Sequence, residues 1–339
     1  MGGAEMDSLK RLSHYKAHMM GIAVMIVVYG HLLYYHGDLI NYEDNHWTEW
    51  YTLGSVEMFI FLSGFGIYQS LRRNREPWQF YQKRLSRLFP SYLPVMLAWC
   101  ALNVFKGKMR LSNAMGNLTG MGWWFQTDHQ FNWYVPAILV LYLISPLLFD
   151  CLEKKKTGWG FGALILLNLA GWRSNLLMAL SRFPTYFMGM WYGKRYAEGR
   201  VPSRREQAIW FAVGAVAMAL VPYFFLIGRR YLWYYGMYWY LFCPAAPLWM
   251  FGISKLLELQ DKIAPGRVLN KIWSFLGVRS FEIYLCHLAL YDTMLKLHVH
   301  GWPQWICIAA AGTGIGIAFH EVVEWCLRKW NSRKTASAA

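Results

Sequence analysis

The sequence predicts an all-α, polytopic membrane protein with about ten transmembrane helices and with both termini in the cytoplasm. Of its 339 residues, 56% are hydrophobic and only 16% are charged, whereas an average soluble domain has about 25% charged residues. Basic residues outnumber acidic ones by 34 to 19, which gives a net charge of +15. A strongly basic protein can bind nucleic acid, but this chain has too few polar residues to form a water-exposed basic face for such binding. We therefore expect no nucleic-acid partner, and the composition also excludes an ordinary soluble enzyme.

Ten apolar stretches are long enough, or nearly so, to cross a membrane. The first, Ala17 to Tyr35, is longer than the apolar core of a signal peptide and has no A-x-A site after it. The stretches lie near residues 17–36, 52–71, 89–105, 132–152, 158–173, 175–193, 207–228, 231–254, 272–295 and 303–327. We expect one transmembrane domain over residues 1–339, with spans from about 17 to 328 and a short basic cytoplasmic tail, 329–339.

The distribution of Lys and Arg sets the orientation. With the N-terminus inside, 25 of the 34 basic residues lie in inner segments, seven lie in outer segments and two lie within spans. This asymmetry is typical of cytoplasmic loops, and it predicts a multi-pass protein with both termini in the cytoplasm. We expect the protein in the plasma or inner membrane, in contact with lipid. The six cysteines lie in or beside apolar stretches without a C-x-x-C spacing, so we expect no metal site.

Two ionisable residues stand out in the first two spans, where such groups are costly and often functional. His31 lies 15 residues after Lys16, about 22 Å along a helix, and so in the outer half of the membrane. Glu57 lies at a similar depth in the next, antiparallel span. A carboxylate beside His31 would fix the tautomer of the ring and raise its basicity, as a general base requires. The alternative is a structural pair that locks two helices together.

Further charged residues lie on both sides of the membrane. Arg84 and Arg87 are three residues apart and share a helix face, which suits phosphate groups, although contact with anionic lipid is the simpler explanation. Arg182 interrupts a span and needs a carboxylate or a water-filled cavity. His287 lies about 24 Å beyond Lys271, again toward the outer side. Outer polar residues above a basic inner rim fit either a transporter cavity or a buried catalytic centre.

Several motifs occur in an order that resembles a known family. They are Ile26 to His31, Gly54 to Phe65, Arg84 to Pro90, Asn132 to Val135, Arg182 to Gly189, and Ser280 with Ile283 to His287. From about residue 16 to 290 the chain resembles acyltransferase family 3, a family of integral-membrane acyltransferases.

This resemblance implies an O-acyltransferase of a bacterial cell membrane. It would move an acyl group, with acetyl expected, from acyl-CoA to a hydroxyl group on a cell-envelope or exopolysaccharide glycan or another acceptor. The resemblance makes His31 the general base and Glu57 the group that orients it. The residues expected to bind the donor are Lys16, Arg84, Arg87 and Arg182, where Arg182 has the alternative role of neutralising Glu57. The residues expected to bind the acceptor are Trp133, Tyr134, Ser280 and His287.

One position departs from the family pattern. The family usually has a basic residue eleven positions before the histidine of the first span, and this chain has Met20 there. Lys16 lies one turn earlier on a similar face and is the candidate substitute. Two alternatives therefore stay open: an inactive relative, and a transporter or flippase of a lipid-linked or amphipathic substrate. The absence of a visible inverted repeat in the sequence favours the enzyme over the transporter.

Overall fold

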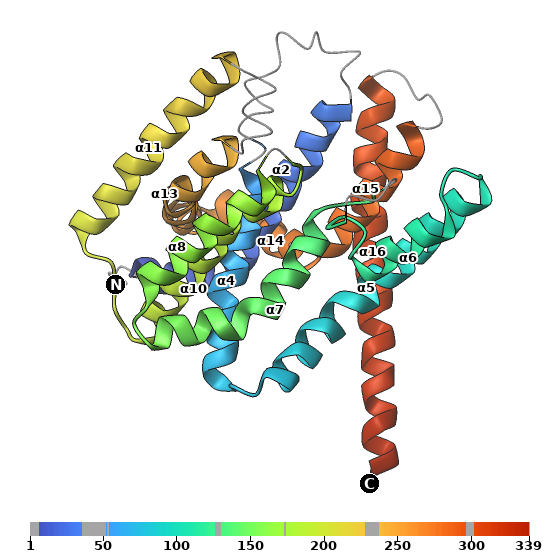
Figure 1. Ribbon diagram of the computed structural model, residues 1–339, viewed down its shortest axis with the longest axis horizontal. Helices are drawn as coiled ribbons and strands as arrows, with labels where there is room; N and C mark the ends of the chain where they lie inside the picture. The colour runs from blue at the N-terminus through green and yellow to red at the C-terminus, as the bar shows by residue number, and fades with distance from the viewer. Residues whose placement is uncertain are drawn as a thin grey trace.

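The computed structural model describes residues 7–35, 52, 54–125, 130–172, 174–227, 237–295 and 302–338, and the described part is helical throughout, with no strand (Figure 1). The first half contains α1 (Ser8–His14), α2 (Lys16–Tyr35), α4 (Ser55–Arg73), α5 (Pro77–Phe105), α6 (Leu111–Thr119), α7 (Tyr134–Glu153) and α8 (Thr157–Leu167). The second half contains η1 (Asn168–Gly171), α9 (Leu177–Leu180), α10 (Phe183–Ala197), α11 (Arg204–Ile227), α13 (Met237–Gln260), α14 (Ala264–Val278), α15 (Ser280–Leu295) and α16 (Trp302–Ala338). The all-α prediction is thus confirmed.

Five helices of the described chain are long and apolar enough to cross a membrane. They are Pro77–Phe105, Tyr134–Glu153, Arg204–Tyr223, Tyr240–Gln260 and Trp305–Ser332. Lys16–Leu32 and Thr157–Gly171 are shorter apolar helices. The other expected spans coincide with α4, with α9 and α10, and with α14 and α15, which are short or carry charged residues. The protein is therefore a helical membrane protein, while the count of ten spans and the cytoplasmic termini stay predictions.

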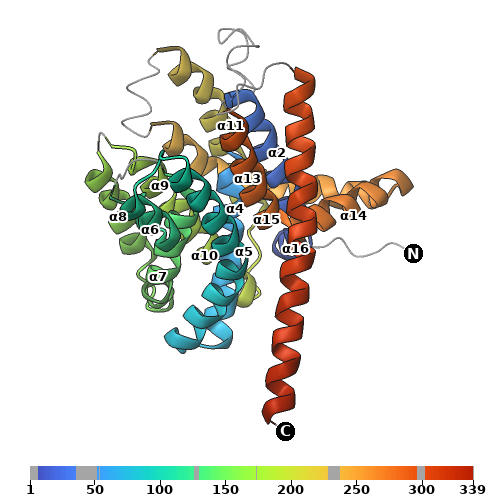
Figure 2. The ribbon, with the colours of Figure 1, turned by 90° about the vertical axis from the view of Figure 1, so that its right-hand side faces the viewer.

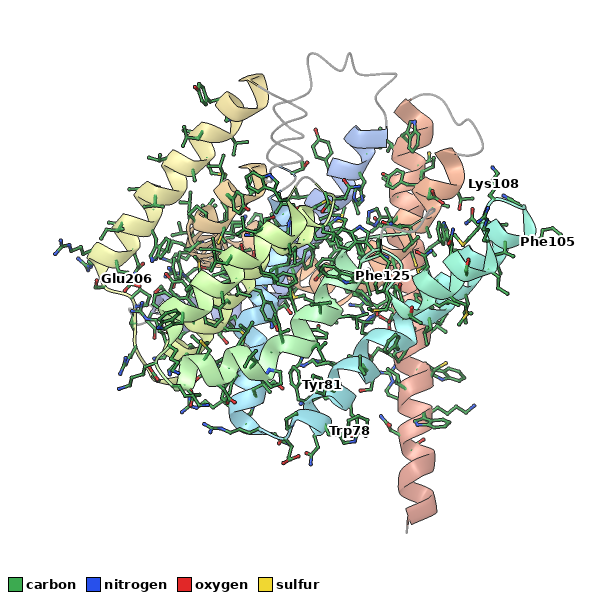
Figure 3. All side chains as sticks on the ribbon, in the orientation of Figure 1. Trp78, Tyr81, Phe105, Lys108, Phe125 and Glu206 are labelled. Carbon is green, nitrogen blue, oxygen red and sulfur yellow. The ribbon has the colours of Figure 1, made fainter. Side chains whose placement is uncertain are left out.

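Large hydrophobic side chains are exposed on α5, α7, α8, α11 and α16, as contact with lipid requires. α11 lies at one edge of the molecule, and the C-terminal part of α16 extends beyond the other helices (Figures 1 and 2). Exposed aromatic side chains mark both ends of α5, with Trp78 near its start and Phe105 at its end (Figure 3). Aromatic residues at both ends of a span are typical of the two membrane–water interfaces.

Two glycines hold α4 against α10 at the centre of the bundle. A side chain at Gly64 would collide with the backbone carbonyl of Tyr186, and one at Gly189 with that of Phe61. Small residues at these positions let the two backbones come into contact, as they commonly do in membrane helix pairs. This contact sets which face of α4 is turned toward α10.

The expected span 272–295 is two helices, not one. α14 ends at Val278 and α15 begins at Ser280, with Arg279 between them. α14 lies across the direction of α16 (Figure 2) and packs on α2, where Gly21 and Gly277 bring the two backbones together. α15 therefore packs beside α2 and α16 as a helix separate from α14.

Candidate active site

A pair of histidines joins α2 to α15. Nδ1 of His31 lies 2.9 Å from Nε2 of His287, and the two rings stack with centroids 5.1 Å apart and an angle of 23° between their planes. His287 is fully buried, and His31 is half-buried. Two residues that are 256 positions apart in the sequence thus form one polar centre between apolar helices.

Hydrogen bonds determine which ring nitrogens carry protons in this pair. Nδ1 of His287 lies 2.8 Å from the backbone oxygen of Ile283, which can only accept a hydrogen bond. In the neutral ring, Nδ1 of His287 therefore carries the proton and its Nε2 accepts. Nδ1 of His31 must then donate to His287, which leaves a lone pair on Nε2 of His31. A lone pair on that nitrogen is what a general base needs.

Glu57 forms a second buried pair, with Arg182. Nε of Arg182 lies 2.8 Å from Oε1 of Glu57, and both side chains are almost completely buried. Arg182 also donates from Nη1 to the backbone oxygen of Met178, and its guanidinium lies 4.6 Å from the ring centre of Trp133. Arg182 thus has its alternative predicted role, the neutralisation of Glu57, and it is enclosed away from any donor phosphate.

The structure does not form the expected pair between His31 and Glu57. The face of α4 that carries Glu57 is turned toward α10 because the backbones meet at Gly64 and Gly189. His31 instead faces α15, where the imidazole of His287 occupies the place expected for a carboxylate. Glu57 therefore has no direct contact with His31, and the residue that does contact the His31 ring is His287.

The start of α10 is an unfavourable place for a buried cation, and this makes the partner of Arg182 important. Arg182 precedes the first residue of the helix, and Pro184 lies in the first turn, where its fixed φ and missing N–H are tolerated. The positive end of the helix dipole is unfavourable for a cation. The carboxylate of Glu57 offsets both this repulsion and the loss of hydration, so the pair connects α4 and α10 as a unit.

Three cations gather at the other end of α2. The ammonium of Lys16 lies in the space left by the missing side chain of Gly66, within electrostatic range of Arg84 and Arg87. Among the described residues no carboxylate forms an ion pair with Lys16, Arg84 or Arg87, and the buried Nε of Arg84 has no hydrogen-bond partner. We call these three residues the basic cluster. Uncompensated cations held together in this way favour a polyanionic ligand.

Tyrosines connect the basic cluster with the histidine pair. Tyr142 and Tyr186 lie within electrostatic range of Arg84, and both are also near Tyr134. The ring of Tyr134 lies 5.5 Å from that of Tyr284, whose ring lies 5.9 Å from that of His287. Polar side chains therefore follow one another from the N-terminal end of α2, where Lys16 lies, to its C-terminal half, where His31 lies.

The four residues expected to bind the acceptor do not form one site in the structure. Tyr134 belongs to the tyrosine series, and His287 belongs to the histidine pair. Trp133 stacks on Arg182, so one face of its ring is occupied. Ser280 is buried at the first turn of α15, seven residues and about 10 Å before His287. Ser280 is thus not brought to the histidine pair.

The fold and these polar centres define a helical membrane protein that holds a pair of hydrogen-bonded histidines inside the bundle. The family model of the acyltransferase domain, acyltransferase family 3, matches residues 18–321. Because this match covers most of the chain, the protein belongs to that family and is a membrane acyltransferase. No curated protein and no solved structure matches the chain.

Proposed function

We propose that the protein transfers an acyl group, with acetyl expected, from acyl-CoA to a hydroxyl group, and that His31 is the general base. The acceptor would be a cell-envelope or exopolysaccharide glycan, or another hydroxyl compound, at a bacterial cell membrane. The observation that carries this proposal is the hydrogen-bond order from Ile283 through His287 to His31, which leaves Nε2 of His31 unprotonated. Family membership supplies the type of reaction.

The basic cluster supports CoA as the donor. CoA carries a pyrophosphate and a further phosphate at one end, and its thioester lies at the far end of the long pantetheine arm. Lys16, Arg84 and Arg87 would bind the phosphates, since no carboxylate of the described chain neutralises them. Lys16 and His31 are 15 residues apart on α2, about 22 Å. The arm would run along the tyrosine series toward the histidine pair.

The chemical step follows from the protonation of the histidine pair. Nε2 of His31 accepts the proton of the acceptor hydroxyl while the hydroxyl oxygen attacks the thioester carbonyl carbon. The carbon–sulfur bond then breaks, and the proton passes to the sulfur, which gives the ester and free CoA. His287 keeps its bond to Nδ1 of His31 throughout, so the ring holds its orientation and the imidazolium that forms is supported by an acceptor.

Release of CoA by the purified protein tests this proposal. Wild-type protein in liposomes should release CoA from acetyl-CoA, and His31→Ala should lower the rate by about 10²–10⁴-fold, the usual contribution of a general base. His18→Ala is the matched control, because His18 lies on the same helix near its inner end. An unchanged rate in His31→Ala would remove His31 from the mechanism. Movement of an amphipathic substrate without CoA release would favour a flippase.

A further inference from the structure

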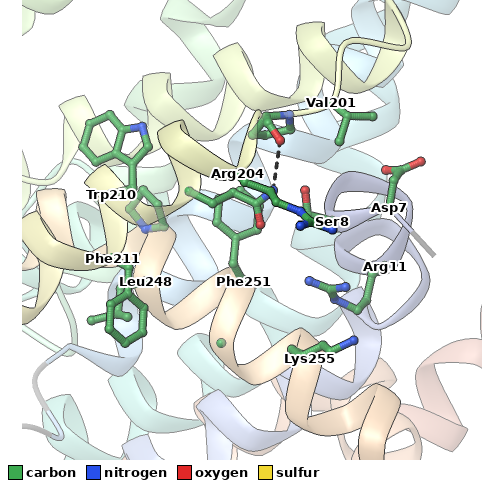
Figure 4. Close-up of a pocket in the computed structure, with 14 residues that line it drawn as sticks. Asp7, Ser8, Arg11, Val201, Arg204, Trp210, Phe211, Leu248, Phe251 and Lys255 are labelled. Carbon is green, nitrogen blue, oxygen red and sulfur yellow. Dashed lines mark hydrogen bonds between the residues drawn. The ribbon is translucent and has the colours of Figure 1, made fainter. Parts of the chain in front are cut away.

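A second polar region lies away from the histidine pair and the basic cluster. A cavity of about 560 Å³ opens between α1, α11 and α13 (Figure 4). Its volume falls in the range of about 300–1,000 Å³ that small-molecule sites occupy. None of the residues placed above in the candidate active site lines it. It therefore requires an explanation separate from acyl transfer.

The lining of this cavity has a charged end and an apolar end. Arg204 begins α11 and Lys255 lies near the end of α13, so the two antiparallel helices bring their basic ends together. Phe211 and Leu248 lie seven residues deeper on the same helices, about 10 Å away along the axis. Figure 4 shows Arg204, Arg11 and Lys255 on one side and Phe211 and Leu248 on the other. This lining matches an amphiphile better than a wholly polar ligand.

Three cations line the charged end, Arg11, Arg204 and Lys255. Nη1 of Arg11 and Nζ of Lys255 lie 3.6 Å and 2.7 Å from Oε2 of Glu258. Arg204 forms no ion pair with any carboxylate of the described chain. The positive charge of Arg204 therefore favours an anionic head group at this end.

The one carboxylate that lines the cavity is already engaged. Asp7 caps α1 by accepting from the backbone N–H groups of Leu9 and Lys10, and its carboxylate lies 3.2 Å from Nζ of Lys10. Although burial raises the pKa of Asp7, these hydrogen bonds and the charge of Lys10 hold it below its ordinary value. Asp7 therefore stays ionised, but Lys10 offsets its charge.

The apolar end borders the lipid. Only 22% of the apolar stretch of α11 is buried within the protein, and Ile209 and Phe211 are 52% and 61% exposed. A soluble anion would use the arginines but would leave this apolar wall without a function. An acyl chain of a membrane lipid reaches the same wall directly from the bilayer.

We propose that this cavity binds an anionic glycerophospholipid from the leaflet that faces the basic ends of α11 and α13. The phosphate lies against Arg204, with Arg11 and Lys255 beside it. One acyl chain lies along Phe211 and Leu248. The bound lipid fills the space between α1 and the α11–α13 pair and so attaches the N-terminal helix to the membrane domain.

Native mass spectrometry of the full chain in detergent tests this site, with dioleoylphosphatidylglycerol as the probe. We expect one tightly bound phosphatidylglycerol per chain, and weaker binding of dioleoylphosphatidylcholine. R204E removes the unpaired cation and should weaken phosphatidylglycerol binding by about tenfold or more, the value of one charge-assisted hydrogen bond. R205E is the matched control, because Arg205 is the next residue and is exposed as Arg204 is, but it does not line the cavity.

A second pair of variants fills space and leaves the charge unchanged. A side chain at Gly252 would meet no atom within 4 Å, so G252L should enter the cavity without a clash and weaken lipid binding. Gly162 on α8 has equally open surroundings, and G162L should bind lipid as the wild type does. Wild-type affinity in both R204E and G252L would overturn the proposal. So would equal binding of the two lipids, or displacement of phosphatidylglycerol by equimolar glycerol 3-phosphate, which would indicate a site for soluble phosphate. None of these outcomes depends on CoA release.

Discussion

The molecule contains two buried polar pairs that differ in what they leave available. Glu57 and Arg182 are both almost completely enclosed, each satisfies the other's charge, and Trp133 covers the guanidinium. His31 and His287 are neutral partners in a directed hydrogen bond, and the half-buried ring of His31 keeps a lone pair on Nε2. Burial of a complete ion pair connects helices, whereas an imidazole with a fixed tautomer can take up a proton. We therefore assign a structural role to the first pair and propose a chemical role for the second.

The largest expected effect tests the structural half of this comparison. Glu57→Ala leaves the guanidinium of Arg182 buried without its carboxylate, which should cost about 3–5 kcal/mol of stability. Loss of monodisperse protein and a lower unfolding temperature in detergent would show this. Arg75→Ala is the control, since Arg75 pairs with Glu153 at an exposed position, where an ion pair contributes about 1 kcal/mol or less. A Glu57→Ala protein of wild-type stability would mean that the pair does not hold α4 to α10.

The next effect concerns the donor and separates binding from chemistry. Arg84→Ala removes one cation of the basic cluster and should raise KM for acetyl-CoA by about tenfold while kcat changes little. Steady-state kinetics with acetyl-CoA and with S-acetyl-N-acetylcysteamine, a thioester without phosphates, would measure this. Lys83→Ala, at the exposed neighbouring position, should leave both substrates unaffected. Equal losses with both thioesters would assign Arg84 a structural role.

The sequence predicted the helical class and the family, because each depends on local pattern. The same local pattern singled out His31, whose role as the base stays a prediction. His31 was evident as an ionisable group in an apolar span. The depth of His287 was counted from Lys271 along a single helix, and the structure breaks that helix at Arg279, so the count did not support the pairing. The choice of Glu57 as the partner of His31 failed because depth says nothing about which way a helix is rotated. That rotation is fixed by Gly64 and Gly189, whose contact partners lie far away in the sequence.

The break at Arg279 shows a related limit. An apolar stretch of the right length predicts one span, but α14 ends at Val278 and packs on α2, where Gly277 closely approaches Ala17, and α15 begins at Ser280. Likewise, the replacement of the family's basic residue by Met20 left the donor side uncertain from sequence. In the structure, Lys16 lies with Arg84 and Arg87, while Met20 packs among apolar neighbours. The position of α14 and the neighbours of Lys16 and Met20 both depend on contacts between distant helices, which local spacing does not reveal.

A double-mutant cycle on the two histidines tests the central claim most directly, with kcat for acetyl-CoA turnover as the readout. His287→Ala should lower kcat by at least about 10²-fold, with KM and the unfolding temperature nearly unchanged, because it releases the tautomer and orientation of His31. In a protein that already carries His31→Ala, the same change should cost nothing further, since the two residues act as one unit. Losses that multiply independently, or full activity in His287→Ala, would contradict the account of His287 as the residue that positions the base.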